Sequence, residues 1–260
     1  MTPNARTLRT PPFAATLLLA LSLSAGAAPL DDMVALDAVY IPALASTSAA
    51  AQNTSAVPRA QAALAALQTQ WPTLRRRLGA TWGTRPPAVW TTALNGAGRQ
   101  IAEAATAASR ADWTQAHEAL EPVRLELAKA RRQLGMDYAV DRLTAFHGPM
   151  EDLARAGATW PATSVDAARR SELKRHFAHA RARWHAVEAS TIDAAAHGLS
   201  AARAAQLRQA MDAESAALSR LSDALRADDT AHLLKGAVAI KPPFARAFTS
   251  FGQSDGDAKR

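Results

Sequence analysis

"AQAALAALQTQWPTLRRRL", residues 60–78, decides the fold class. Its apolar residues recur every three or four positions, which is the period of an α-helix that buries one face. A second stretch, "LKRHFAHARARWHAV" at residues 173–187, has the same period. Such single apolar stripes are typical of antiparallel helical bundles. The stripes are Ala60, Leu64, Leu67, Trp71, Leu74 and Leu78 in the first stretch, and Leu173, Phe177, Ala180, Trp184 and Val187 in the second.

The rest of the sequence also favours helices. Alanine, leucine, arginine, glutamine and glutamate dominate, whereas β-branched residues are few and glycine, with 12 residues, clusters at breaks. No long alternation of apolar and polar residues predicts a strand. We therefore predict an all-α protein, an antiparallel helical bundle. Helix breaks are expected at 51–58, 79–88, 95–98, 135, 157–165 and 197–200, and inside a last helix at Pro242-Pro243.

Four landmarks occur twice in the same order, which predicts an internal duplication. The two stripes align at a spacing of 113 residues, with Trp71 over Trp184. The other pairs are "VYIPAL" (39–44) with "FHGPME" (146–151), "RADWTQAH" (110–117) with "RADDTAH" (226–232), and "LAKARRQLG" (127–135) with "FARAFTSFG" (244–252). We expect two units of roughly four helices, residues 28–135 and 136–252, followed by a disordered tail at 253–260.

The N-terminus has the pattern of a secretory signal peptide. Arg6 and Arg9 precede the short apolar run "FAATLLLALSLSAGA" (13–27), which ends in the small-residue cleavage pattern "AGA". The run is too short to anchor the protein in a membrane, and no other apolar run looks long enough. The sequence therefore predicts cleavage near Ala27, a periplasmic or secreted protein, and no transmembrane anchor.

Charge and cysteine content exclude several kinds of site. The chain has 30 basic and 23 acidic side chains, a net charge of +7. Removing Arg6 and Arg9 with the signal peptide leaves 28 basic side chains and a net charge of +5. The absence of cysteine excludes disulfides, thiolate metal sites, cysteine nucleophiles and covalently attached c-type haem.

The stretch "TAFHGPMEDL" (144–153) contains the best candidate site. His147 and Glu151 are four residues apart, so they share a helix face and form either a metal-chelating pair or an ordinary helix ion pair. Pro149 kinks the expected helix. Met150 lies on the core stripe of this helix, and Tyr40 aligns with His147 in the other unit. The candidate residues for a metal ion or a b-type haem are His147, Glu151, Met150, Asp141, Tyr138 and Tyr40.

His117 and His232 are secondary candidates, because they recur at matching positions in the two units. Each follows an aspartate expected to cap a helix, Asp112 in the first unit and Asp228 or Asp229 in the second. They therefore form either a symmetric histidine pair or two capped helix starts.

A basic patch is expected on the helix that carries Trp184. It is either a solvated helix face or a surface for an anionic partner, such as an acidic or redox protein of the cell envelope. Export argues against nucleic acid as the partner. The patch comprises Arg169, Arg170, Lys174, Arg175, Arg181 and Arg183.

In architecture, an exported, all-helical, two-unit chain with a His–acid pair resembles the imelysin group of periplasmic proteins. That group has an H-x-x-E motif, whereas this sequence has His147-x-x-x-Glu151 with Met150 in the acidic position. The resemblance therefore implies an architecture and no site residue. Small periplasmic haem-binding bundles are similar in the same limited sense.

No pattern in the sequence indicates an enzyme, because it has no G-x-S-x-G, H-E-x-x-H or glycine-rich phosphate loop. The first hypothesis is an exported, non-enzymatic helical-bundle binding protein, with a metal ion or haem near His147 and Glu151. The alternative is a ligand-free helical interaction protein, an accessory of an envelope system.

Overall fold

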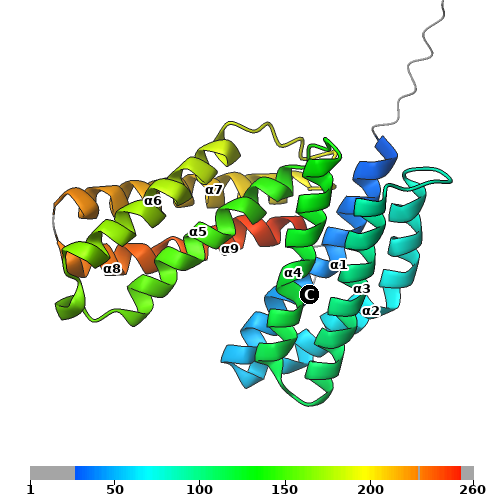
Figure 1. The fold of residues 1–260 in the computed structure, drawn as a ribbon, viewed down its shortest axis with the longest axis horizontal. Coiled ribbons are helices and arrows are strands. Elements are labelled where there is room, and N and C mark those ends of the chain that lie inside the picture. The colour runs from blue at the N-terminus through cyan, green and yellow to red at the C-terminus, as the bar shows by residue number, and fades with distance from the viewer. Residues whose placement is uncertain (1–26, 228, 253–260) are drawn as a thin grey trace, which may run out of the picture.

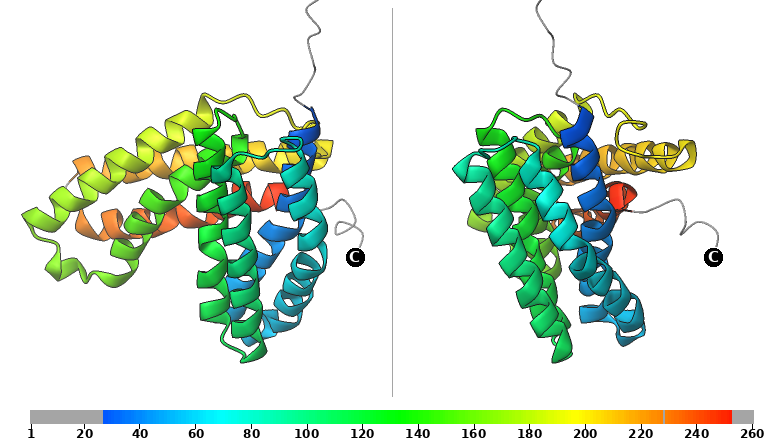
Figure 2. Two further views of the ribbon diagram at one scale, coloured as in Figure 1. Left: turned by 45° about the vertical axis from the view of Figure 1, so that its right-hand side comes forward. Right: turned by 90° about the vertical axis from the view of Figure 1, so that its right-hand side faces the viewer.

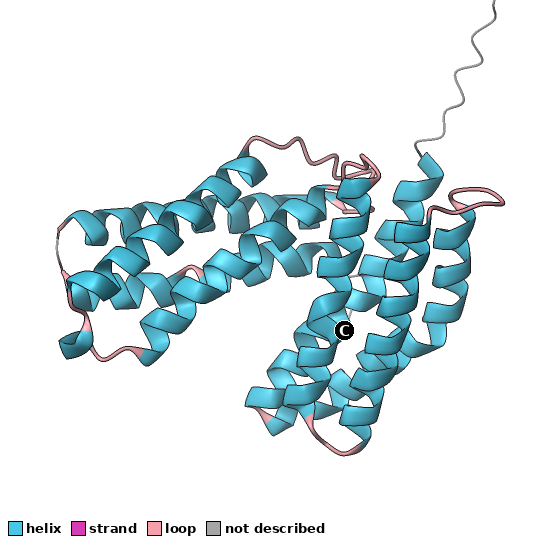
Figure 3. Cartoon of the chain, in the orientation of Figure 1, coloured by secondary structure: helices cyan, strands magenta, loops and turns pink. Residues whose placement is uncertain are grey.

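The computed structural model describes residues 27–227 and 229–252, and within them it is all-helical, without a strand (Figure 3). The expected signal peptide and the expected tail lie outside these residues, apart from Ala27. In chain order, the helices are α1 (Ala27–Gln52), α2 (Val57–Ala80), α3 (Ala88–Ser109), α4 (Trp113–Gln133), α5 (Ala139–Thr159), α6 (Ala167–Glu188), α7 (Ala201–Arg226), α8 (Thr230–Ala239) and α9 (Lys241–Thr249). Short 3-10 turns lie at Thr54–Ala56 (η1), Ala162–Ser164 (η2) and Ser250–Gly252 (η3).

The helices form two groups that diverge from a common junction (Figure 1). In the first group, α1 packs on α2 and α4, and α3 packs on α2 and α4. In the second, α5 packs on α6, α8 and α9, and α7 packs on α6, α8 and α9. The junction is made by α1 against α9 and η3, and by α4 against α5, and the turned views show the same crossing (Figure 2).

Residues of the two sequence stripes lie in the core, as their spacing predicts. Leu64, Leu67, Trp71 and Leu74 are buried in the first group, and Trp184 is fully buried in the second. One cluster of buried apolar side chains runs from Met33 in α1 to Phe251 in η3, so the two groups share a continuous core.

Helix ends follow the local sequence. The carboxylates of Asp112 and Asp229 accept hydrogen bonds from the backbone N–H groups of Gln115 and His232, which confirms both expected N-caps. The prediction that Pro242-Pro243 interrupts the last helix is also confirmed, because α8 ends at Ala239 and α9 begins at Lys241 with proline in its first turn.

The break expected at 95–98 is wrong, since α3 runs through it. A methyl group on Gly96 would meet the carboxylate of Glu126, and one on Gly98 would meet the indole of Trp71 at 2.9 Å. These glycines allow close packing of α3 against α4 and α2, and that packing offsets the roughly 1 kcal/mol helix cost of a glycine. Pro149, where a kink was expected, lies inside α5, and Pro42 lies inside α1.

The segment Leu30–Gln52 of α1 is long and apolar enough to cross a membrane by length and composition, contrary to the expectation that no such run follows the signal peptide. Half of its most apolar window is buried inside the structure, against α2, α4 and η3. Core helices of soluble proteins also meet this criterion, so the segment is weak evidence for a span.

Candidate functional site

His147 lies where α5 meets α4 and α9, and both of its ring nitrogens face charged groups. Nδ1 is 2.7 Å from Nη2 of Arg124, and Nε2 is 3.5 Å from Oε1 of Glu151. Arginine can only donate, so Nδ1 accepts and the ring proton is on Nε2, facing the carboxylate. The Nζ of Lys241 binds Glu151 at 2.8 Å. The predicted pair therefore exists, as part of a chain of charges across three helices.

The charge chain lowers the pKa of Glu151 to about 2. Burial favours the neutral acid, but hydrogen bonds from His147 and Lys241 outweigh burial and stabilise the carboxylate. A metal ion on His147 and Glu151 would have to displace Lys241 and compete with Arg124. Among the described residues, no group of three or more histidine and acidic side chains is arranged to hold a metal ion. The side chains at this place therefore do not fit a metal or haem site.

The other metal or haem candidates point elsewhere. Met150 is fully buried in the core, as its place on the apolar stripe predicts. The hydroxyl of Tyr40 donates to the carbonyl oxygen of Leu120 at 2.9 Å, and burial raises its pKa. Tyr40 and His147 thus contact α4 one turn apart, at Leu120 and Arg124. The structure does not bring Met150, Tyr40 and His147 together around one ligand.

Tyr138 and Asp141 belong to a separate buried network at the junction. The hydroxyl of Tyr138 donates to Oδ2 of Asp37 at 2.5 Å, and Arg131 binds Asp141 through two hydrogen bonds of 2.8 and 2.5 Å. The guanidinium of Arg131 lies 4.9 Å from the centre of the Tyr138 ring, and the ring of His197 stacks on the same tyrosine. Asp141 thus binds the guanidinium of Arg131 directly, whereas Asp37 binds Tyr138 and interacts with Arg131 through its charge alone.

Sequence reasoning missed Asp37, Arg131 and His197. A signal for Asp37 did exist in the sequence, because it is the one charged residue in the apolar run from Met33 to Gln52. Arg131 and His197 had no local signal, since their partners lie on other elements.

Replacing Asp37 with asparagine is expected to remove a pH dependence of stability between about pH 4 and pH 6. Burial raises the pKa of Asp37 from 3.8 to about 6, although the Tyr138 hydroxyl and Arg131 favour its charged form. A raised acid pKa means that the stabilising contribution is complete below pH 3.8 and is lost as the pH rises to about 6. The loss is about 3 kcal/mol. Urea denaturation at several pH values across this range measures the free energy of unfolding. An equal change of this free energy with pH in wild type and variant would contradict the assignment.

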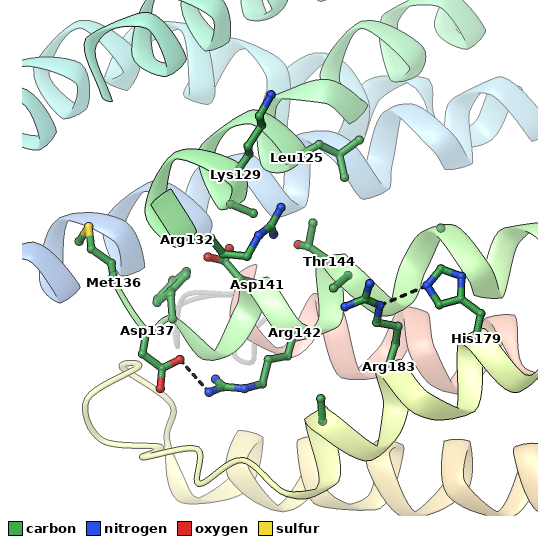
Figure 4. A pocket seen from close by; sticks show the side chains of 15 residues that line it. Leu125, Lys129, Arg132, Met136, Asp137, Asp141, Arg142, Thr144, His179 and Arg183 are labelled. Carbon is green, nitrogen blue, oxygen red and sulfur yellow. Dashed lines mark hydrogen bonds and ion pairs between the residues drawn. The ribbon is translucent and has the colours of Figure 1, made fainter. Parts of the chain in front are cut away.

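A cleft of about 690 Å³ lies between α4, α5 and α6 (Figure 4). Arg132 reaches in from α4 and Arg183 from α6, on either side of Thr144. Small side chains form much of the surface between them, and Leu125 on the rim is half exposed. The lining comprises Leu125, Ala128, Lys129, Arg132, Met136, Asp137, Tyr138, Asp141, Arg142, Thr144, Ala145, Gly148, His179, Arg183 and Ala186.

Positive charge is in excess in this cleft. Its two acids are both neutralised, Asp141 by Arg131 and Asp137 by Arg142 at 2.7 Å. Lys129, Arg132 and Arg183 have no carboxylate partner among the residues that the structure describes, and Arg183 donates instead to Nε2 of His179 at 3.3 Å. Cations that lack counter-ions and face a concave surface favour an anionic ligand.

The residues of the expected basic patch lie in three different surroundings. Arg169 and Arg170 are half-buried, Arg169 against the ring of Trp160 and Arg170 against the hydroxyl of Thr230. Arg183 faces the cleft. The exposed remainder is Lys174, Arg175 and Arg181, of which Arg181 binds Glu188 at 3.0 Å.

His117 and His232 lie in different surroundings. Nδ1 of His117 is 3.1 Å from the carbonyl oxygen of Leu44, and its other nitrogen faces Glu121 at 3.5 Å. His232 is exposed and contacts Asp229, the residue that caps its own helix. The surroundings favour capped helix starts over a symmetric ligand pair.

Comparison with models of protein families, with curated proteins and with solved structures finds no match for this chain.

Proposed function

We propose that this protein is an exported, non-enzymatic binding protein that holds an anionic small molecule in the cleft between α4, α5 and α6. One observation carries the proposal: Lys129, Arg132 and Arg183 line the cleft without carboxylate partners, while both acids of the cleft are neutralised by other arginines. The three cations come from helices of different groups, so a ligand between them would contact both groups.

The shape of the cleft favours a ligand with an apolar body and acidic groups. Its volume of about 690 Å³ lies within the range of roughly 300–1,000 Å³ that is usual for small-molecule sites. Ala128, Ala145, Gly148 and Ala186 leave room between the walls, and Leu125 supplies apolar contact. A carboxylate-bearing amphipathic molecule matches both features.

The cleft lining supports binding without catalysis. Catalysis by nucleophilic attack needs an activated side chain next to a base. Thr144 is the hydroxyl at the centre of the cleft, and the imidazole of the lining, His179, contacts Arg183. Export, in turn, rests on the signal-like sequence of residues 1–27.

We also infer that the two helix groups arose by duplication. The duplication is supported by three features that occur in the same order in both groups. They are a proline within α1 and within α5, a buried tryptophan in α2 and in α6, and an aspartate cap at the start of α4 and of α8. The cleft is lined by α4 from one group and by α5 and α6 from the other, so a ligand bound there would lie at the boundary between the two groups.

A second candidate function is docking of an acidic envelope protein on the exposed part of α6. Lys174, Arg175 and Arg181 support this function, because an exposed basic helix face attracts acidic surfaces. Native mass spectrometry of protein from a periplasm separates the two functions. A co-purifying small acid supports the cleft, whereas association with an acidic protein that weakens with salt supports docking.

Single substitutions in the cleft are expected to weaken binding without unfolding the protein. Arg132→Gln and Arg183→Gln should each weaken binding of an amphipathic dicarboxylate at least about tenfold, the usual effect of losing a charged hydrogen bond. Gly148→Leu should block the cleft, because Gly148 lines it and a Cβ atom there meets nothing within 4 Å, so the leucine side chain can enter the open space. Calorimetric titration measures affinity, and melting temperature checks the fold.

Lys174→Gln, on the exposed part of the same helix as Arg183, is the matched control and should bind like wild type. Equal affinity in all four variants would refute the cleft. An elemental analysis and an absorption spectrum of the same sample test the metal or haem hypothesis. A stoichiometric metal or a Soret band that is lost in His147→Ala would instead indicate a metal or haem site at His147 and Glu151.

A further inference from the structure

Two tryptophans at matching positions have different hydrogen bonds. Trp71 in α2 and Trp184 in α6 are 113 residues apart, and both are buried. The indole N–H of Trp184 donates to the hydroxyl of Ser215 at 2.8 Å, and that hydroxyl donates to Oε1 of Glu188 at 2.6 Å. In the second helix group, a carboxylate of the protein therefore ends the hydrogen-bond chain from the indole.

The first helix group has no such acceptor. The indole of Trp71 lies over Gly98 in α3, where a methyl group would be 2.9 Å from Nε1. No hydrogen bond joins this Nε1 to any residue that the structure describes. The position that matches Glu188, again 113 residues earlier, is Arg75. A cation thus replaces the carboxylate, and the indole N–H is left without an acceptor on the protein.

Trp71 lines a groove between α2 and α3 of about 570 Å³, here called the Trp71 groove, with Arg75, Asn95, Gly98, Arg99 and Ala102. Nη2 of Arg75 donates to the amide oxygen of Asn95 at 2.6 Å, so its charge is not neutralised there. Arg99 has no carboxylate partner in the described part of the chain. Three donor groups, one indole N–H and two guanidinium groups, thus line one groove.

We propose that the Trp71 groove is a second binding site, which takes the carboxylate group of a small molecule. The ligand carboxylate accepts from the Trp71 indole and pairs with Arg75 and Arg99, as an external counterpart of Glu188 in the other group. An inorganic phosphate offers similar oxygen acceptors, so the shared chemistry is that of an oxyanion. The groove lies in the first helix group, away from the α4–α5–α6 cleft, and does not depend on the function proposed for it.

The indole resonances of ¹⁵N-labelled full-length protein test this proposal directly. Trp71→Phe identifies the Trp71 signal, and Trp184, whose N–H is bonded to Ser215, is an internal control. Citrate and inorganic phosphate are titrated separately at constant pH and ionic strength. We expect a saturable shift of the Trp71 signal, with the Trp184 signal unchanged. If citrate shifts the Trp71 signal and phosphate does not, the site is specific for carboxylates. If citrate and phosphate both shift it, the site binds oxyanions in general.

Arg99→Gln is expected to weaken this shift at least about tenfold, the effect of losing one charged hydrogen bond. Arg59→Gln, an exposed arginine near the start of α2, is the matched control and should leave the titration unchanged. The Gly148→Leu variant should keep the Trp71 shift even though its cleft is blocked. A Trp71 signal that does not move, or moves equally in the Arg99 and Arg59 variants, would overturn the proposal.

Discussion

Raising the pH from about 4.5 to about 8 is expected to lower the free energy of unfolding by about 4–5 kcal/mol through one side chain, Glu214. Glu214 lies in α7, is fully buried, and neither carboxylate oxygen has a hydrogen bond of normal geometry. Burial raises its pKa from 4.5 to about 8, and the backbone of Phe244 and the charge of Arg246 only partly oppose this shift. Glu214 is therefore a neutral acid in the folded protein below pH 8.

The direction of this effect follows from proton linkage. The folded state holds the Glu214 proton more tightly than the unfolded state, so the stabilising contribution is complete below pH 4.5. It is lost gradually as the pH rises through the folded pKa of about 8. Asp37 contributes a further loss of stability as the pH rises to about 6. Glu151 has the opposite effect, because its lowered pKa means that stability is lost as the pH falls below 4.5.

Urea denaturation between pH 5 and pH 9 measures this effect. Glu214→Gln keeps the shape of the side chain without its ionisation, so its stability should change much less over this range. Asp37→Asn should leave the loss between pH 6 and pH 8 intact, which separates the two acids. A wild-type stability that is constant from pH 5 to pH 8 would contradict a neutral buried Glu214.

Replacing Trp184 with alanine is expected to cost about 3–5 kcal/mol of folding free energy. The side chain has no exposed surface, its ring centre is 4.9 Å from that of Phe146, and its N–H is bonded to Ser215. The substitution leaves a cavity between α5, α6 and α7 and removes the donor for Ser215. The melting temperature should fall by about 10 °C.

Trp184→Phe should lose much less stability, because it retains an aromatic ring against Phe146. Ala182→Ser, at an exposed position of the same helix, should leave the melting temperature within a degree or two of wild type. An unchanged melting temperature in Trp184→Ala would contradict a core position for this residue.

The sequence was most informative where structure depends on neighbours along one helix. The spacing of Leu64, Leu67 and Trp71 predicted a buried face, and the aspartates Asp112 and Asp229 predicted two helix starts. It was misleading at Asn95–Gly98, where two glycines suggested a break. Their role is visible only with Glu126 and Trp71 packed against α3. A glycine that permits close packing and one that ends a helix look alike in sequence.

The candidate site was predicted in part for the same reason. His147 and Glu151 share a face, as a spacing of four residues requires, and their side chains are 3.5 Å apart. Their other partners, Arg124 and Lys241, are 23 residues from His147 and 90 residues from Glu151. These partners turn a candidate chelating pair into a hydrogen-bonded chain that ends in the Glu151–Lys241 ion pair, and no local pattern predicted them.

The sequence by itself determined that this protein is helical, where several of its helices begin, and which faces they bury, because these properties follow from periodicity and capping within a few turns. The tertiary structure alone decided which polar groups meet. Tyr138 donates to Asp37 across 101 residues of chain, and the cations of the cleft come from α4 and α6. Charges and pKa values depend on distances in space and on burial, and both arise only when helices distant in sequence pack together.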